Sequence, residues 1–105
     1  VGSSVPSTYE VDEATVAASR FFVDFRDSAL QLAGEFRRAR DQGLVDDGHI
    51  LGCVGEVLRG KVAGRRDAAE ITLFKSLGMI CEDLVAADEV LREAERTGRG
   101  ALVDW

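Results

Sequence analysis

Two short segments of this chain have the pattern of buried β-strands. Residues 20–25 (Arg-Phe-Phe-Val-Asp-Phe) are aromatic and β-branched and almost continuously apolar, as is typical of a strand covered on both faces. Residues 70–75 (Glu-Ile-Thr-Leu-Phe-Lys) have the same character. The roughly 45 residues between them are mostly helical in pattern, so the connection is a crossover and the two strands are predicted to be parallel.

Two helices are predicted around the first strand. Asp12 is suited to cap a short helix over residues 13–18, because its carboxylate would bind free N–H groups at the helix start. Asp27 is suited to cap a second helix, which ends near Arg40.

Two further helices are predicted beyond residue 45. One follows Asp46-Asp47-Gly48 and stops at Gly60, and its shared apolar face consists of Ile50, Val54, Val57 and Leu58. The longest helix covers residues 77–97, with an apolar stripe formed by Ile80, Leu84, Ala87, Leu91 and Ala94. Because two strands do not make a stable sheet alone, we expect an incomplete α/β fold that belongs to a larger domain or borrows strands from a partner.

Composition narrows the function classes. The 105 residues are 46% hydrophobic and 30% charged, which is typical of a globular domain. The net charge of −6 argues against a nucleic-acid partner, since phosphate binding needs clustered Lys and Arg. No apolar run approaches the roughly 20 residues that span a bilayer, and no signal peptide is visible, so we expect a cytoplasmic protein without membrane partners. Cys53 and Cys81 lack metal-site spacing and are expected to be buried, unpaired thiols, and no metal site is predicted.

Ligands of open α/β sheets bind beyond the carboxyl ends of the strands. Two segments have that position: Gly2-Ser3-Ser4, if a strand precedes Val1, and Ser76-Leu77-Gly78 after the second predicted strand. The second segment would offer the free N–H groups of a helix start to a ligand oxygen, with Ser76 as cap or ligand contact. On spacing alone, an ordinary turn and cap is the preferred interpretation of either segment.

Four single residues have two interpretations each. Asp24 ends the first strand and is suited equally to a ligand contact or a cap. We expect Lys75 to reach solvent rather than substrate, and His49 to be a surface or capping residue rather than a catalytic one. Trp105 is expected to pack against a further domain.

Several segments resemble the ornithine cyclodeaminase/mu-crystallin family. Residues 70–79, followed by Glu82-Asp83-Leu84 and Ala86-Ala87, are similar to the family's closing strand–helix signature. The opening Val1-Gly2-Ser3-Ser4-Val5-Pro6, followed by Glu10-Val11-Asp12, is similar to its loop after the fourth strand of the dinucleotide-binding domain. Five further pieces follow in the family's order: Val23-Asp24, Ala29-Leu30, Ala33-Gly34-Glu35, Gly55-Glu56-Val57-Leu58-Arg59-Gly60 and Gly64-Arg65.

The resemblance implies the C-terminal portion of a Rossmann-like parallel sheet with helices. Residues 1–97 would form the second half of an NAD(P)-binding domain, and residues 98–105 a tail that packs on a domain outside this sequence. Carried over by position, the cofactor contacts would be Val1, Gly2, Ser3, Ser4, Thr8 and Ser76. The backbone of Leu77 and Gly78 would border the substrate.

The chain departs from the family pattern at two of these positions. Ornithine cyclodeaminases and related alanine dehydrogenases place a catalytic Asp where this chain has Ser4, and some members place a Lys at the position of Thr8. A hydroxyl does not serve as a carboxylate base at neutral pH without an activating partner, so no catalytic residue is assigned. The resemblance therefore implies a reductase or dehydrogenase acting on an amino or imino acid rather than ornithine deamination.

The resemblance also implies limits on this chain alone. The Gly-x-Gly-x-x-Gly loop that grips the pyrophosphate does not occur in the sequence, so the chain alone is predicted to bind NAD(P) weakly or not at all. NAD and NADP are equally compatible, and the full-length protein is expected to be a homodimer. The alternatives are a non-catalytic mu-crystallin-like small-molecule binder, an inert module, or a coiled-coil-like module built on residues 77–97.

Overall fold

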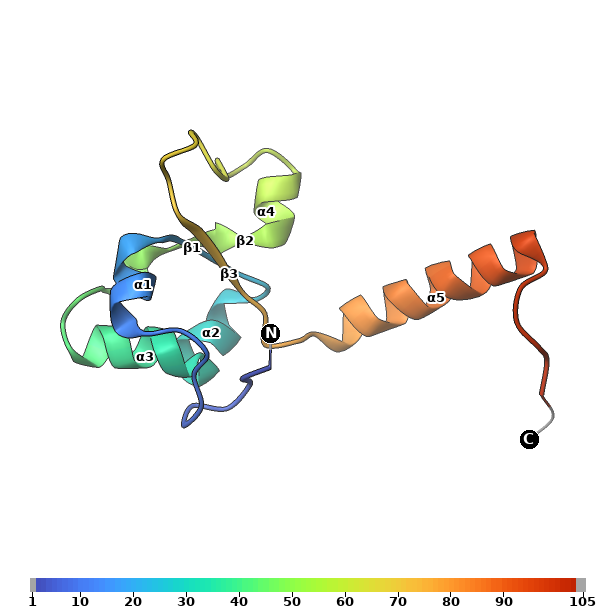
Figure 1. Ribbon diagram of the computed structural model, residues 1–105, viewed down its shortest axis with the longest axis horizontal. Helices are drawn as coiled ribbons and strands as arrows, with labels where there is room; N and C mark the ends of the chain where they lie inside the picture. The colour runs from blue at the N-terminus through green and yellow to red at the C-terminus, as the bar shows by residue number, and fades with distance from the viewer. Residues whose placement is uncertain (1, 104–105) are drawn as a thin grey trace.

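Three short parallel strands lie side by side in the computed structural model, which describes residues 2–103 (Figure 1). The strands are β1 (Arg20–Val23), β2 (Ile50–Cys53) and β3 (Thr72–Lys75), in the order β2-β1-β3. The pairing of β1 with β3 is parallel, as predicted, and β2, which was not predicted as a strand, also pairs with β1 in parallel. The carboxyl ends of all three strands therefore lie at the same edge of the sheet, and this edge positions the candidate site.

One prediction for the middle of the chain is wrong. Residues 50–53 are expected from the sequence to be helical, but Ile50–Cys53 is a strand that pairs with β1, with Ile50 opposite Phe21. Only the following residues are helical, as α4 (Val54–Leu58). The spacing of the apolar residues in this segment fits a helix as well as a short buried strand, and pairing with β1 decides between them.

Three helices cover one face of the sheet: α1 (Glu13–Ala18), α2 (Arg26–Leu32) and α3 (Gly34–Asp41). The core between them and the sheet is formed by Val16, Phe21, Val23, Ala29, Ala33, Phe36, Ala39 and Ile50. Phe21 and Phe36 stack with ring centroids 5.6 Å apart, which ties β1 to α3. The predicted first helix is confirmed, because Asp12 accepts a hydrogen bond from the Thr15 N–H at 2.7 Å.

The single helix predicted from Asp27 to Arg40 is interrupted. Ala33 has extended backbone angles and separates α2 from α3. The N-terminal loop lies against the start of α3, and a Cβ atom on Gly34 would come within 1.9 Å of the Thr8 carbonyl oxygen. Gly34 therefore permits a loop contact that local sequence patterns do not reveal.

The last helix, α5 (Ile80–Thr97), begins three residues later than predicted and extends away from the sheet (Figure 1). Within the described chain, none of its residues is buried, and four of the five residues of the predicted apolar stripe are exposed, with Leu84 at 66%, while Ala94 is half-buried. It ends at Gly98, whose φ of +66° is the left-handed conformation that glycine adopts readily. Leu102 in the tail is fully exposed, whereas Trp105 lies outside the described residues.

Two further expectations concern the thiols and the membrane. Cys53 and Cys81 are free, as predicted, but neither is buried. Cys53 is half-buried, and Cys81 is exposed because it lies on the projecting α5. None of the helices in residues 2–103 combines the length and apolar character needed to cross a bilayer.

Candidate functional site

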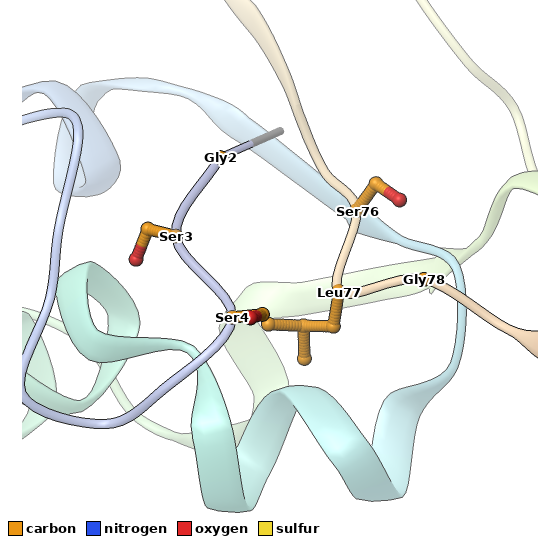
Figure 2. Close-up of a pocket in the computed structure, with 6 residues that line it drawn as sticks. All are labelled: Gly2, Ser3, Ser4, Ser76, Leu77 and Gly78. Carbon is orange, nitrogen blue, oxygen red and sulfur yellow. The ribbon is translucent and has the colours of Figure 1, made fainter.

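The two segments predicted to meet a ligand lie together at the carboxyl edge of the sheet. Gly2, Ser3 and Ser4 form one side of a hollow of about 220 Å³, and Ser76, Leu77 and Gly78 form the other (Figure 2). Ser76 directly follows β3, so the strand places its turn at this edge. Figure 2 shows the Leu77 side chain directed toward Ser4.

Asp24 holds the turn after β3. It directly follows β1, the neighbour of β3 in the sheet, and only 6% of its surface is exposed. Its Oδ2 atom accepts hydrogen bonds from the N–H groups of Leu77 and Gly78, at 2.6 and 2.7 Å, and from the Ser76 hydroxyl at 3.2 Å. Asp24 is not a helix cap, because the N-caps of α2 and α5 are Phe25 and Met79 and neither helix start has a side-chain cap hydrogen bond; it binds the turn after β3 instead.

These contacts correct the expectation of free N–H groups at this turn. The N–H groups of Leu77 and Gly78 are bound to Asp24, and α5 begins only at Ile80. Gly78 has a φ of +87°, which favours glycine and lets the turn curl around the carboxylate. Because the Ser76 hydroxyl donates its proton to Asp24, its oxygen is left to accept a hydrogen bond from a ligand.

Hydroxyl contacts hold the first loop in shape. The buried Ser3 hydroxyl lies 2.8 Å from the Thr8 hydroxyl, and Thr8 also donates to the Val5 carbonyl at 3.0 Å. Thr8 therefore does not line the hollow and instead supports Ser3, which does. Val1, also predicted to meet a ligand, lies outside the described residues.

Lys75 contradicts the expectation that it reaches solvent. Its side chain is 3% exposed, and its Nζ atom lies 3.1 Å from Oε1 of Glu35 and 3.3 Å from Oε2 of Glu10. Glu10 in turn lies beside Gly2, where a Cβ atom would come within 2.7 Å of its Oε1 atom. The ion pairs thus link the end of β3 to α3 and to the first loop.

The partner role of Glu10 and Glu35 is not evident from their positions in the sequence. Glu35 is 2% exposed and stands in the first turn of α3, where a carboxylate is ordinarily assigned to the helix dipole. One feature of the sequence does point to such a partner. Lys75 ends a strand with a buried pattern, and a buried lysine needs an acidic side chain beside it.

His49 has a structural role, as expected. Its Nε2 atom lies 2.8 Å from the Val16 carbonyl oxygen, and its ring stacks on Phe21 with centroids 6.3 Å apart. It connects the turn before β2 to α1, away from the hollow.

The described residues at the hollow supply groups for binding and none for proton transfer. The six of them that line it are glycine, serine and leucine, none of which is ionised at neutral pH. Across residues 2–103, no cluster of His, Cys, Asp or Glu is arranged to hold a metal ion. A wall of small residues and hydroxyls suits close packing against a flat ligand.

Comparison with known proteins agrees with this arrangement. A sequence profile of the ornithine cyclodeaminase/mu-crystallin family matches residues 1–98. The Delta(1)-pyrroline-2-carboxylate reductase of Bacillus thuringiensis subsp. konkukian (strain 97-27) is 31% identical over 106 residues, covering 100% of this chain and 33% of that protein.

Two solved structures share the fold. The Delta(1)-pyrroline-2-carboxylate reductase of Thermococcus litoralis, in complex with NADH and L-proline, has a TM-score of 0.80 and 34% identity, covering 93% of this chain and 30% of that one. The iminosuccinate reductase of Paracoccus denitrificans, in complex with NAD+, has a TM-score of 0.78 and 30% identity, covering 99% of this chain and 31% of that one.

The chain spans about a third of the length of the relatives that it matches. Its parallel sheet and helices match part of the Rossmann-like fold of these structures. The profile match extends over nearly all of the chain, from the first loop to the end of α5. The chain therefore belongs to the ornithine cyclodeaminase/mu-crystallin family.

Proposed function

We propose that this chain forms the nicotinamide-binding side of an NAD(P)-dependent oxidoreductase that acts on an amino or imino acid. The observation that carries the proposal is the shared hollow, since two loops far apart in the sequence line it together. Its volume of about 220 Å³ is below the roughly 300–1,000 Å³ of a site for a whole drug-sized ligand, so it suits one ring rather than a dinucleotide.

In this proposal, residues 1–97 are the second half of the cofactor-binding domain, and residues 98–105 pack on the rest of the protein. Gly2, Ser3, Ser4 and Ser76 contact the cofactor, and Thr8 acts through Ser3. Leu77 and Gly78 border the substrate with their carbonyl groups and the Leu77 side chain, because Asp24 binds their N–H groups.

The relatives support an imino-acid substrate. One solved relative holds NADH and L-proline, and another is an iminosuccinate reductase with NAD+. Bound NAD(P)H would supply the hydride, while this chain's residues hold the ring and exclude water. Ser4 offers no carboxylate base, which favours a reductase or dehydrogenase over an ornithine deaminase. NAD and NADP remain equally compatible, and the homodimer and the cytoplasmic location stay predictions.

A hybrid protein tests the proposal. Residues 1–98 replace the corresponding segment of the Thermococcus litoralis reductase, and NADH- and NADPH-dependent reduction of Delta(1)-pyrroline-2-carboxylate is measured. We expect turnover with at least one cofactor, and a KM for that cofactor raised about three- to tenfold by Ser76→Ala, the effect of one lost hydrogen bond. Ser7→Ala, an exposed serine of the first loop, is the matched control and should leave KM unchanged.

Two other outcomes are informative. A folded hybrid that binds neither cofactor contradicts the proposal. A hybrid that binds a cofactor but does not turn over favours the second candidate, a non-catalytic small-molecule binder. The observation in favour of that candidate is the absence of ionisable side chains among the six described residues that line the hollow.

A further inference from the structure

The Asp24 carboxylate lies directly behind one wall of the hollow. All three residues of the turn that line the hollow, Ser76, Leu77 and Gly78, donate to the same oxygen atom, Oδ2. Its other oxygen, Oδ1, accepts from the Phe25 N–H at 2.8 Å. One buried side chain thus determines the shape of this whole wall.

These contacts leave the charge of Asp24 uncompensated. Its four donors are three backbone N–H groups and a hydroxyl, all of which are neutral. At 6% exposure, water and salt screen the carboxylate poorly. Within residues 2–103, no Lys or Arg side chain forms an ion pair with Asp24, and the ammonium of Lys75 pairs with Glu10 and Glu35 instead.

We propose that Asp24 is the positioning residue of the Ser76–Gly78 turn, and that its charge makes the hollow prefer the oxidised, cationic nicotinamide ring over the reduced, neutral ring. The second part rests on the proposed function. A single carboxylate behind the wall should favour the cationic ring about three- to tenfold, the range expected for one charge at intermediate dielectric.

Three substitutions separate geometry from charge. Asp24→Asn keeps the size of the side chain, removes its charge and leaves only one acceptor oxygen for four donors. Asp24→Glu keeps the charge but displaces the oxygens. Asp41→Asn removes the same charge from the exposed end of α3 and is the matched control.

The positioning role is tested without any ligand, by NMR of the isotope-labelled 105-residue chain. We expect Asp24→Asn and Asp24→Glu to shift the amide signals of Leu77 and Gly78 and to speed their hydrogen exchange at least tenfold, while Asp41→Asn leaves them unchanged. Signals of Phe21 and Val23 report whether each variant is folded. Unchanged Leu77 and Gly78 amides in a folded Asp24→Asn chain would overturn the positioning role.

The charge preference is tested with oxidised and reduced nicotinamide mononucleotide, which differ in the charge of the ring and need no pyrophosphate site. We expect the oxidised form to shift the amides of Ser3, Ser4 and Ser76 at about three- to tenfold lower concentration. The ratio of the concentrations at which the reduced and the oxidised form shift these amides should fall toward one in Asp24→Asn and persist in Asp24→Glu and Asp41→Asn. In the unsubstituted chain the same ratio should become smaller at 1 M salt.

The outcomes distinguish the two proposals. If the oxidised and reduced forms bind equally, and the ratio of their binding concentrations changes neither with substitution of Asp24 nor with salt, the charge preference is wrong. The nicotinamide site is not contradicted by that result. If neither form shifts the hollow's amides in the isolated chain, the comparison is repeated on the hybrid protein. A folded hybrid that binds neither the oxidised nor the reduced cofactor overturns both the nicotinamide site and the charge preference, and the ligand-free result alone then decides the positioning role. The salt series on the unsubstituted chain keeps the charge preference testable even if Asp24→Asn does not fold.

Discussion

Lys75 and Glu35 form an ion pair that is almost wholly enclosed. The Nζ atom of Lys75 lies 3.1 Å from Oε1 of Glu35, and the two side chains are 3% and 2% exposed. Oε2 of Glu35 is also buried and has no hydrogen-bond partner within the described residues. Each charge therefore depends on the other, and the pair joins the end of β3 to the start of α3.

Replacing Lys75 tests this dependence. Lys75→Met leaves Glu35 as an uncompensated buried charge, and we expect the free energy of unfolding to fall by about 3–5 kcal/mol. Lys61→Met, at an exposed position, should change it by less than about 0.5 kcal/mol. The double variant Lys75→Met/Glu35→Leu should recover most of the loss. Urea unfolding followed by circular dichroism measures all three, and equal stability of the two single variants would contradict the prediction.

Gly34 allows the first loop to lie on α3. In Gly34→Ala, the new Cβ atom would meet the Thr8 carbonyl oxygen at 1.9 Å, so the backbone must shift, and we expect a loss of about 1–3 kcal/mol. Gly55→Ala in α4 is the matched control, because nothing lies within 4 Å of its Cβ position. It should be neutral or stabilising by up to about 1 kcal/mol. If thermal unfolding shows equal effects for both variants, the loop contact does not constrain the fold.

Glu70 makes stability depend on acid pH. The Arg66 side chain, followed by its backbone N–H, holds the pKa of Glu70 below its ordinary value of 4.5. A carboxyl whose pKa is lower in the folded state contributes stability above its unfolded pKa, and this contribution is lost as the pH falls through the folded pKa.

Glu70→Gln should therefore lower the melting temperature at pH 7, and the difference from the parent chain should shrink as the pH falls below about 4.5. Glu95→Gln, at an exposed position of α5, is the control and should keep the parent pH profile. Melting temperatures measured from pH 7 to pH 3 check this, and parallel profiles for the parent and Glu70→Gln would refute it.

The contribution of α5 to the stability of this chain should be small. Leu84 is 66% exposed whereas Ile50 is 1% exposed. We expect Leu84→Ala to change the free energy of unfolding by less than about 0.5 kcal/mol, and Ile50→Ala to lower it by about 2–5 kcal/mol. A similar loss for both variants would mean that α5 packs on the sheet in solution.

Hydrogen exchange gives an independent measure. An isolated helix of this length is marginal in water, so amides of α5 should exchange orders of magnitude faster than those of β1. Equal protection of the two elements would contradict the exposed position of α5.

The sequence by itself determined what depends on neighbours along the chain. The Asp12 cap, the apolar runs of β1 and β3 and the end of the last helix at residue 97 are local signals; the cap and the helix end lie where they were predicted, and the two strands lie within the predicted runs but are shorter. The parallel pairing also followed from the sequence, since the length and helical pattern of the connection require a crossover. The position of the two candidate loops at one edge of the sheet was predictable, because the carboxyl ends of parallel strands meet there.

Only the tertiary structure decided which alternative applied where local signals were ambiguous. Ile50–Cys53 is a strand because β1 offers it a partner, and the extended backbone of Ala33 separates two helices directly before Gly34, on which the first loop packs. The roles of Asp24 and Lys75 depend on partners from distant segments, which no spacing reveals. Burial and long-range hydrogen bonds involve larger free energies than local propensity, so the packed fold determines the geometry at these positions.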